Sequence, residues 1–279
     1  MFKVALSSAK SNTGLSGAQV IRSLCGEGED DDVDRAVLLA NMRNKLHKFL
    51  LKDKPHIKMY LKLRKMHSKI LDGMMDYYHT DKFEQKVNNA FMSQNTLGNK
   101  TKDNTAILFE SYFDLDTNLG NQAFADRMVY KNFPNMPCIT EEFIKTNRYR
   151  IPEKIEFLHS MLEAKLGLFE TINVDSKEGY AYLKEVFTGK EYKITDIGLS
   201  GSCSYTNLYL YTRIVTYRDI SFSSGLNLAF SKKDPFIQEF IKKQKANYNP
   251  LHDVARFTEL YNQFVNDPNG IKVTRNSFQ

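Results

Sequence analysis

The chain has 279 residues, 42% hydrophobic and 12% aromatic, which is enough to build one large domain or two small ones around a real core. No run approaches the roughly 18 apolar residues of a membrane span, and the apolar run at the start is too short for a signal peptide. We therefore expect a cytoplasmic protein with no membrane partner. The three cysteines are far apart and form no CxxC pair, which excludes a disulfide framework and a zinc knuckle.

The net charge of +6 is spread unevenly along the chain. Residues 35–70 contain eleven Lys or Arg and one acid, Asp53. Directly upstream, residues 27–34 (EGEDDDVD) contain six acids. Adjacent blocks of opposite sign are typical of segments that interact with charged partners.

The first third of the chain predicts basic helices. Residues 33–51 have acids at their start and lysines toward their end, as the helix dipole favours. Pro55 suits the first turn of a second helix, and apolar residues from Tyr60 to Tyr77 recur at three- and four-residue spacing. We expect an amphipathic helix of some twenty residues after Pro55.

Four lysines lie on one face of this second helix, because their spacing of 4, 3 and 4 residues matches the helical repeat. We call them the lysine stripe: Lys58, Lys62, Lys65 and Lys69. Like charges at this spacing repel each other, so the stripe favours an external polyanion such as nucleic acid. A solvated face, or a face that docks on the acidic residues 27–34, is the alternative.

The same helix offers a second pattern near its end. Asp72, Asp76 and His79 share one helical face, and two carboxylates with an imidazole can hold a divalent metal ion. This geometry is common by chance, and we expect no bound metal ion. The sequence contains no GxSxG, HExxH, P-loop or GxGxxG motif, and we expect no catalytic residues and no cofactor.

The polar residues 93–105 are the best linker, because they lack aromatic side chains. We predict a helical N-terminal region over residues 1–92 and an α+β domain over residues 106–279. In the second region, Pro152 begins a helix with an apolar stripe through Leu166, which Gly167 ends.

Residues 171–230 predict a small antiparallel β-barrel or sandwich, because alternating segments are separated by turn residues every eight to twelve positions. Strands are expected over residues 171–174, 180–187, 190–197 and 208–217, a loop over 198–204, and short last strands in ISF and LNLAF. Thr188 and Gly189 predict a tight hairpin turn. Two helices follow, near residues 235–246 and 250–265, so the fold class is α+β.

The strand over residues 208–217 places three tyrosines and an arginine on one face: Tyr209, Tyr211, Arg213 and Tyr217. Barrels that bind single-stranded nucleic acid stack bases on such faces. An ordinary buried face packed against a helix gives the same pattern.

Several segments resemble a group of uncharacterised bacterial proteins, many of which carry a C-terminal SEC-C metal-binding tail. The similar segments are ILFESYFDLDT (107–117), AKLGLFE (164–170), VFTGKEYKITDIGLSGS (186–202) and LYLYTRIV (208–215). The resemblance implies a helix that leads into a strand, a turn with its returning strand in KEVFTGKEYKI, and a last strand through Thr212 to Ile214. The Cys-rich tail is absent here, so the resemblance implies no metal site.

These patterns favour a non-catalytic binding protein whose partner is nucleic acid or an acidic protein surface, with the lysine stripe as the contact. A metal-dependent hydrolase or nuclease that uses Asp72, Asp76 and His79 is the enzymatic alternative. A protein-protein adaptor with an acidic partner is the third hypothesis.

Overall fold

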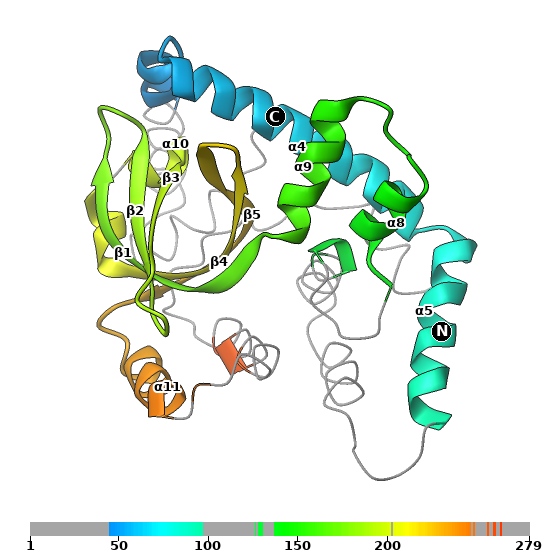
Figure 1. The fold of residues 1–279 in the computed structure, drawn as a ribbon. Coiled ribbons are helices and arrows are strands. Elements are labelled where there is room, and N and C mark those ends of the chain that lie inside the picture. Colours follow the sequence, from blue (N-terminus) through cyan, green and yellow to red (C-terminus); the bar gives the residue numbers. More distant parts are fainter. Residues whose placement is uncertain are drawn as a thin grey trace, which may run out of the picture. The chain divides into compact units, whose positions relative to one another are not determined.

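The computed structural model describes residues 45–96, 126, 128–130, 137–201, 203–246, 248, 256, 259–260 and 263. Residues 45–51 are helical. The elements that follow are α4 (Pro55–Tyr78), α5 (Asp81–Thr96), α8 (Ile139–Lys145), α9 (Pro152–Leu162), β1 (Lys165–Asp175), β2 (Tyr180–Glu185), β3 (Glu191–Thr195), α10 (Ile197–Ser200), the 3-10 helix η2 (Cys203–Asn207), β4 (Leu208–Tyr217), β5 (Ile220–Ser231) and α11 (Pro235–Ala246). With helices before and after an antiparallel sheet, the fold class is α+β, as predicted (Figure 1).

The chain divides into two compact units. Of the described residues, those from 63 to 164 belong to the first unit, and residues 45–62 and those from 165 onward belong to the second. The acidic residues 27–34 and most of the predicted linker lie outside the described residues, as does most of the predicted helix near 250–265.

The described part of the first unit is helical. Leu63, Ile70 and Met74 of α4 are buried at the spacing that the sequence predicts. His67 lies on the same buried face, where its Nε2 atom is 2.5 Å from the Tyr130 hydroxyl. This hydrogen bond pairs a ring nitrogen with a hydroxyl in two residues that are both almost fully buried.

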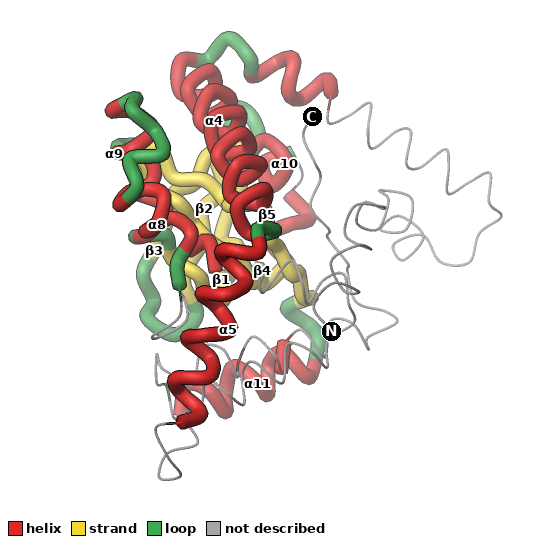
Figure 2. The backbone as a smooth tube through the Cα atoms, turned by 90° about the vertical axis from the view of Figure 1, so that its right-hand side faces the viewer, coloured by secondary structure: helices red, strands yellow, loops and turns green. Residues whose placement is uncertain are grey.

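A five-stranded antiparallel sheet forms the second unit, with the order β3-β2-β1-β4-β5. The edge strands β3 and β5 contact each other, so the sheet curls toward a barrel. The five strands can be followed in Figure 1 and Figure 2. Its inner core consists of Phe169, Ala181, Leu183, Ile194, Leu199, Leu208, Leu210, Ile214 and Ala229.

The predicted hairpin turn is confirmed. β2 and β3 pair with each other, and Gly189 in the turn has a φ of 74°, a conformation that glycine adopts without a steric penalty. The buried carboxylate of Glu185 fixes the turn, because it accepts hydrogen bonds from the backbone N–H (2.9 Å) and the hydroxyl of Thr188.

A second glycine lies in the turn between β1 and β2, which packs against the start of α4. Gly179 has a φ of 78°, and a Cβ atom at this position would lie 2.8 Å from the Ile57 side chain. Lys54 donates a hydrogen bond to the Glu178 carboxylate at 2.7 Å, and the His56 Nε2 atom lies 2.7 Å from the Glu178 carbonyl oxygen. The turn between β1 and β2 is thus held by packing and by hydrogen bonds.

Three predicted boundaries are wrong. α9 ends at Leu162, and residues 165–170 form the start of β1, because their backbone pairs with β4 from Lys165 to Glu170. The two short last strands are one strand, β5, with an irregular register opposite Arg213 of β4. The predicted loop over 198–204 contains α10 and the start of η2, and the Asp196 side chain caps α10 by accepting a hydrogen bond from the Leu199 N–H.

None of the helices in the described part of the chain has the length and apolar content that a membrane crossing requires.

Candidate functional site

The lysine stripe lies on α4, which is one continuous helix of 24 residues. All four of its side chains are exposed. The opposite face of the helix is buried through Ile57, Tyr60, Leu63 and the residues that follow at helical spacing. The exposed positions of the helix therefore present four ammonium groups in a row.

The first lysine of the stripe forms a weak ion pair with a nearby acid. Lys58 lies 3.7 Å from the Asp53 carboxylate, and both side chains are more than half exposed, so the pair contributes little. Within the described residues, no ion pair involves Lys65 or Lys69. The ammonium groups of Lys65 and Lys69 are thus exposed positive charges at the surface.

The charges on α4 also run against the helix dipole. The helix has no acid in its first turn and no base in its last turn. Lys58 lies near the positive end of the dipole, and Asp76 lies near the negative end, so each charge is at the less favourable end. Helix stability therefore does not explain why the lysines are where they are.

The metal-ligand candidates continue the same exposed face beyond the lysine stripe. Asp72, Asp76 and His79 are all exposed. The ring centroids of His79 and Tyr78 are 5.2 Å apart. No three ligand side chains in the described part of the chain lie together in a way that could hold a metal ion. A metal ion at Asp72, Asp76 and His79 stays a prediction.

The stacking candidates of β4 lie mostly inside the protein. Tyr211, Arg213 and Tyr217 are at most 2% exposed, and only Tyr209 is partly accessible. β4 lies between β1 and β5 and is packed on both faces. Rings that are already covered offer no surface on which a base can stack in this conformation.

A different face of the sheet is open, and sequence reasoning missed it. Antiparallel partners share a face, and Tyr182 of β2 pairs with Asn173 of β1 and with Lys193 of β3. Alternation along each strand adds further residues, and together they form what we call the open sheet face: Asn173, Tyr180, Tyr182, Lys184, Glu191 and Lys193. The two tyrosines are half-buried and the other four side chains are exposed. The alternation of side chains in YAYLKE was the feature of the sequence that could have predicted the open sheet face.

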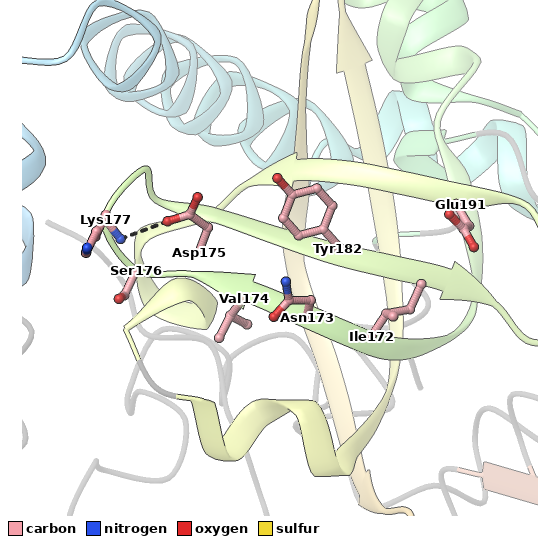
Figure 3. A pocket seen from close by; sticks show the side chains of 8 residues that line it. All are labelled: Ile172, Asn173, Val174, Asp175, Ser176, Lys177, Tyr182 and Glu191. Carbon is pink, nitrogen blue, oxygen red and sulfur yellow. Dashed lines mark hydrogen bonds between the residues drawn. The ribbon is translucent and has the colours of Figure 1, made fainter.

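A hollow of about 490 Å³ lies along this face (Figure 3). It runs from Lys177 beside the β1–β2 turn to Glu191 on β3, with Tyr182 and Asn173 between them. The register of β1 shifts between Thr171 and Asn173, which leaves Ile172 as an extra residue that is 43% exposed. Such bulges redirect side chains and are frequent beside functional sites.

The acid at the turn end of the hollow is already engaged. The Asp175 Oδ1 atom accepts hydrogen bonds from the backbone N–H groups of Lys177 and Glu178, each at 3.0 Å. These bonds offset its charge, so Glu191 is the more available carboxylate among the lining residues.

Tyr180 connects the open sheet face to α4. Its ring stacks on the His56 ring, with centroids 4.7 Å apart, and the Lys193 ammonium lies 3.6 Å from its centroid. Since His56 is in the first turn of α4, the open sheet face adjoins the end of the helix that carries Lys58.

Tyr209 lies at the other border of the open sheet face, because Glu170 pairs with both Tyr209 and Lys184. Burial raises the pKa of the Tyr209 hydroxyl, and the nearby Glu170 carboxylate raises it further. Lys232 donates a hydrogen bond to that carboxylate at 2.8 Å. Tyr209 is therefore a neutral hydroxyl at physiological pH.

Comparison with known proteins places the chain in a family. It belongs to the Family of unknown function (DUF7986), whose model matches residues 54–274. The matched region contains all of α4 and the whole sheet. No curated protein and no solved structure matches the chain.

Proposed function

We propose that this protein binds nucleic acid as a polyanion, through the lysine stripe of α4. The observation that carries the proposal is the exposure of Lys58, Lys62, Lys65 and Lys69 on one side of a continuous helix. A phosphate backbone supplies counter-charge to these exposed ammonium groups, and binding releases condensed ions into solution.

The length of the stripe suits this role. With a rise of about 1.5 Å per residue, the eleven steps from Lys58 to Lys69 cover roughly 16 Å of helix. One strand of a duplex carries a phosphate charge about every 3.4 Å along its axis, so the stripe spans about five phosphates. Each lysine has a different phosphate within reach of its flexible side chain.

Such a contact supplies affinity without reading the sequence. A lysine ammonium acts as a point charge on a phosphate, and phosphate contacts carry no base information. The net charge of +6 adds long-range attraction for an anionic partner. The proposed role is therefore non-catalytic binding with little preference among base sequences.

The test is a set of binding titrations at several salt concentrations with single-stranded DNA, duplex DNA, RNA and polyglutamate. If all four lysines each meet a phosphate, log affinity falls with log salt at a slope of about −3 to −4. The double variant Lys62→Ala, Lys65→Ala makes this slope shallower by about two.

A matched control is available on α11. Lys242 and Lys245 are also exposed and three residues apart on a helix, so changing both to Ala removes the same charge from another surface. The slope should stay unchanged in this control. Equal losses in both double variants, or no binding at low salt, contradict the proposal. Tighter binding to polyglutamate than to nucleic acid supports the adaptor hypothesis with an acidic protein partner.

Two further predictions rest on the sequence. On the similar segments at 107–117, 164–170, 186–202 and 208–215, we propose that the chain is related to the bacterial group that often carries a SEC-C tail. We also propose a cytoplasmic location, which fractionation of cells that express the protein checks.

A further inference from the structure

We propose that the open sheet face stacks the bases of a single strand, so that the protein prefers single-stranded over duplex nucleic acid. This inference rests on the proposed function and names the class of ligand. It moves base stacking from the buried tyrosines of β4 to the accessible Tyr182 of β2.

Tyr182 is the residue placed to stack. Its ring is half-buried and lines the hollow of about 490 Å³, where Figure 3 shows it beside Asn173. Among the described residues no stacked aromatic neighbour covers it, whereas Tyr180 is already stacked on His56. A tyrosine ring with one accessible face on a sheet can stack with any base, because every base has a flat face.

Polar groups surround this ring at the positions where a nucleotide needs them. Lys193 pairs with Tyr182 across β3, and Lys184 follows it on the same face of β2. Both lysines are exposed and can contact the phosphates on either side of a stacked base. The Asn173 side chain, with a donor and an acceptor, lies next to the ring and offers hydrogen bonds to a base edge.

The acids on the open sheet face limit how much electrostatic affinity it can contribute. Glu191 lies directly opposite Lys184, and Asp175 lines the same hollow, so the face has little net positive charge. It cannot supply strong electrostatic affinity alone. The lysine stripe supplies affinity for any phosphate backbone, and the open sheet face adds contacts that only unpaired bases reach.

Within the second unit, the start of α4 adjoins the open sheet face. His56 and Lys58 lie in the first turns of α4, and the His56 ring stacks on Tyr180, the outward neighbour of Tyr182 on β2. Lys54 is fixed to Glu178 at the β1–β2 turn. The start of α4 thus borders the open sheet face, and Lys58 is the stripe lysine nearest to that border in the sequence.

The sequence provides a clean spectroscopic test, because the chain contains no Trp. Tyr182→Trp introduces a single indole in the hollow. We expect oligo(dT) or poly(U) to quench its fluorescence with the same midpoint as binding, and duplex DNA to bind without quenching it. Tyr192→Trp is the control, since Tyr192 is half-buried on the other face of β3, where no quenching is expected.

Affinity variants complete the test. Tyr182→Ala should weaken binding of the single strand about ten-fold and leave duplex binding unchanged, whereas Tyr182→Phe keeps the ring and the preference. Oligo(dT) that binds without quenching the indole overturns this inference while the proposed function stands. Equal losses for single strand and duplex also overturn it. Absence of any nucleic-acid binding overturns the proposed function and this inference together.

Discussion

β2 and β4 have similar sequence patterns, but the tyrosines of β4 are mostly buried and those of β2 are partly accessible. Both alternate tyrosines and a basic residue, in YAYLKE and LYLYTRIVTY. On β4, Tyr211 and Arg213 are buried, whereas on β2, Tyr182 and Lys184 reach the surface. Alternation determines which side chains share a face, but packing partners determine whether that face is open.

The physical cause of the difference is the packing on the outward face of each strand. β5 pairs with β4 and brings Phe222, which contacts the Tyr60 ring of α4 edge to face at 6.3 Å. On the outward side of β2 lie exposed or half-buried side chains of β1 and β3. Tyrosines in the first environment stabilise the fold, and those in the second are available to a ligand.

Exchanging one tyrosine on each strand for alanine gives the largest expected effect. Tyr211→Ala removes a ring that is 2% exposed and should lower the free energy of unfolding by about 3 to 5 kcal/mol. Tyr182→Ala should cost only about 1 kcal/mol or less, through lost cross-strand contacts. Urea unfolding followed by circular dichroism measures both. Similar losses for the two variants contradict the assignment of a buried and an open face.

The comparison also shows what the sequence predicts and what it does not. The bounds of β4 and α11 match their predicted ranges, because turn residues and an Asp-Pro start mark them clearly. The start of β1 was predicted six residues too late, since Lys165 to Glu170 have an apolar pattern that also suits a helix. Pairing with β4 decides the outcome, and no local pattern contains that information.

The candidate site divides in the same way. The lysine stripe is visible in the sequence because helical spacing alone puts its members on one face. The open sheet face depends on the register of three strands, on a bulge at Ile172 and on the absence of a cover over Tyr182 among the described residues. Register and cover are tertiary properties, so only the structure shows this part of the site.

A pair of glycine substitutions sharpens the contrast between the two ends of β2. Gly179 and Gly189 have nearly the same positive φ, 78° and 74°, so an alanine pays a similar conformational cost of about 1 kcal/mol at each. Only at Gly179 would the new Cβ atom clash, 2.8 Å from the Ile57 side chain, whereas at Gly189 the nearest atom is 3.9 Å away.

We therefore expect Gly179→Ala to destabilise the protein by about 2 to 3 kcal/mol and Gly189→Ala by about 1 kcal/mol. The difference between the two variants isolates the packing of the β1–β2 turn against the start of α4. Thermal and urea unfolding measure it. If the two losses are equal, the contact between Gly179 and Ile57 is too loose to hold the open sheet face beside the helix.

The smallest expected effect concerns stability gained at the expense of binding. Lys65→Glu places an acid three residues after Lys62 and four residues before Lys69, so two repulsive pairs become attractive. Each change contributes a few tenths of a kcal/mol, and the free energy of unfolding should rise by about 1 kcal/mol at low salt and by less at high salt. In the same variant, affinity for nucleic acid should fall, and the salt slope should become shallower by at least one.

A lysine that lowers stability but raises affinity is in place for its ligand. If the variant is more stable and binds as tightly as before, the lysine stripe is a solvated face, and the contact with phosphate must be sought elsewhere on the protein.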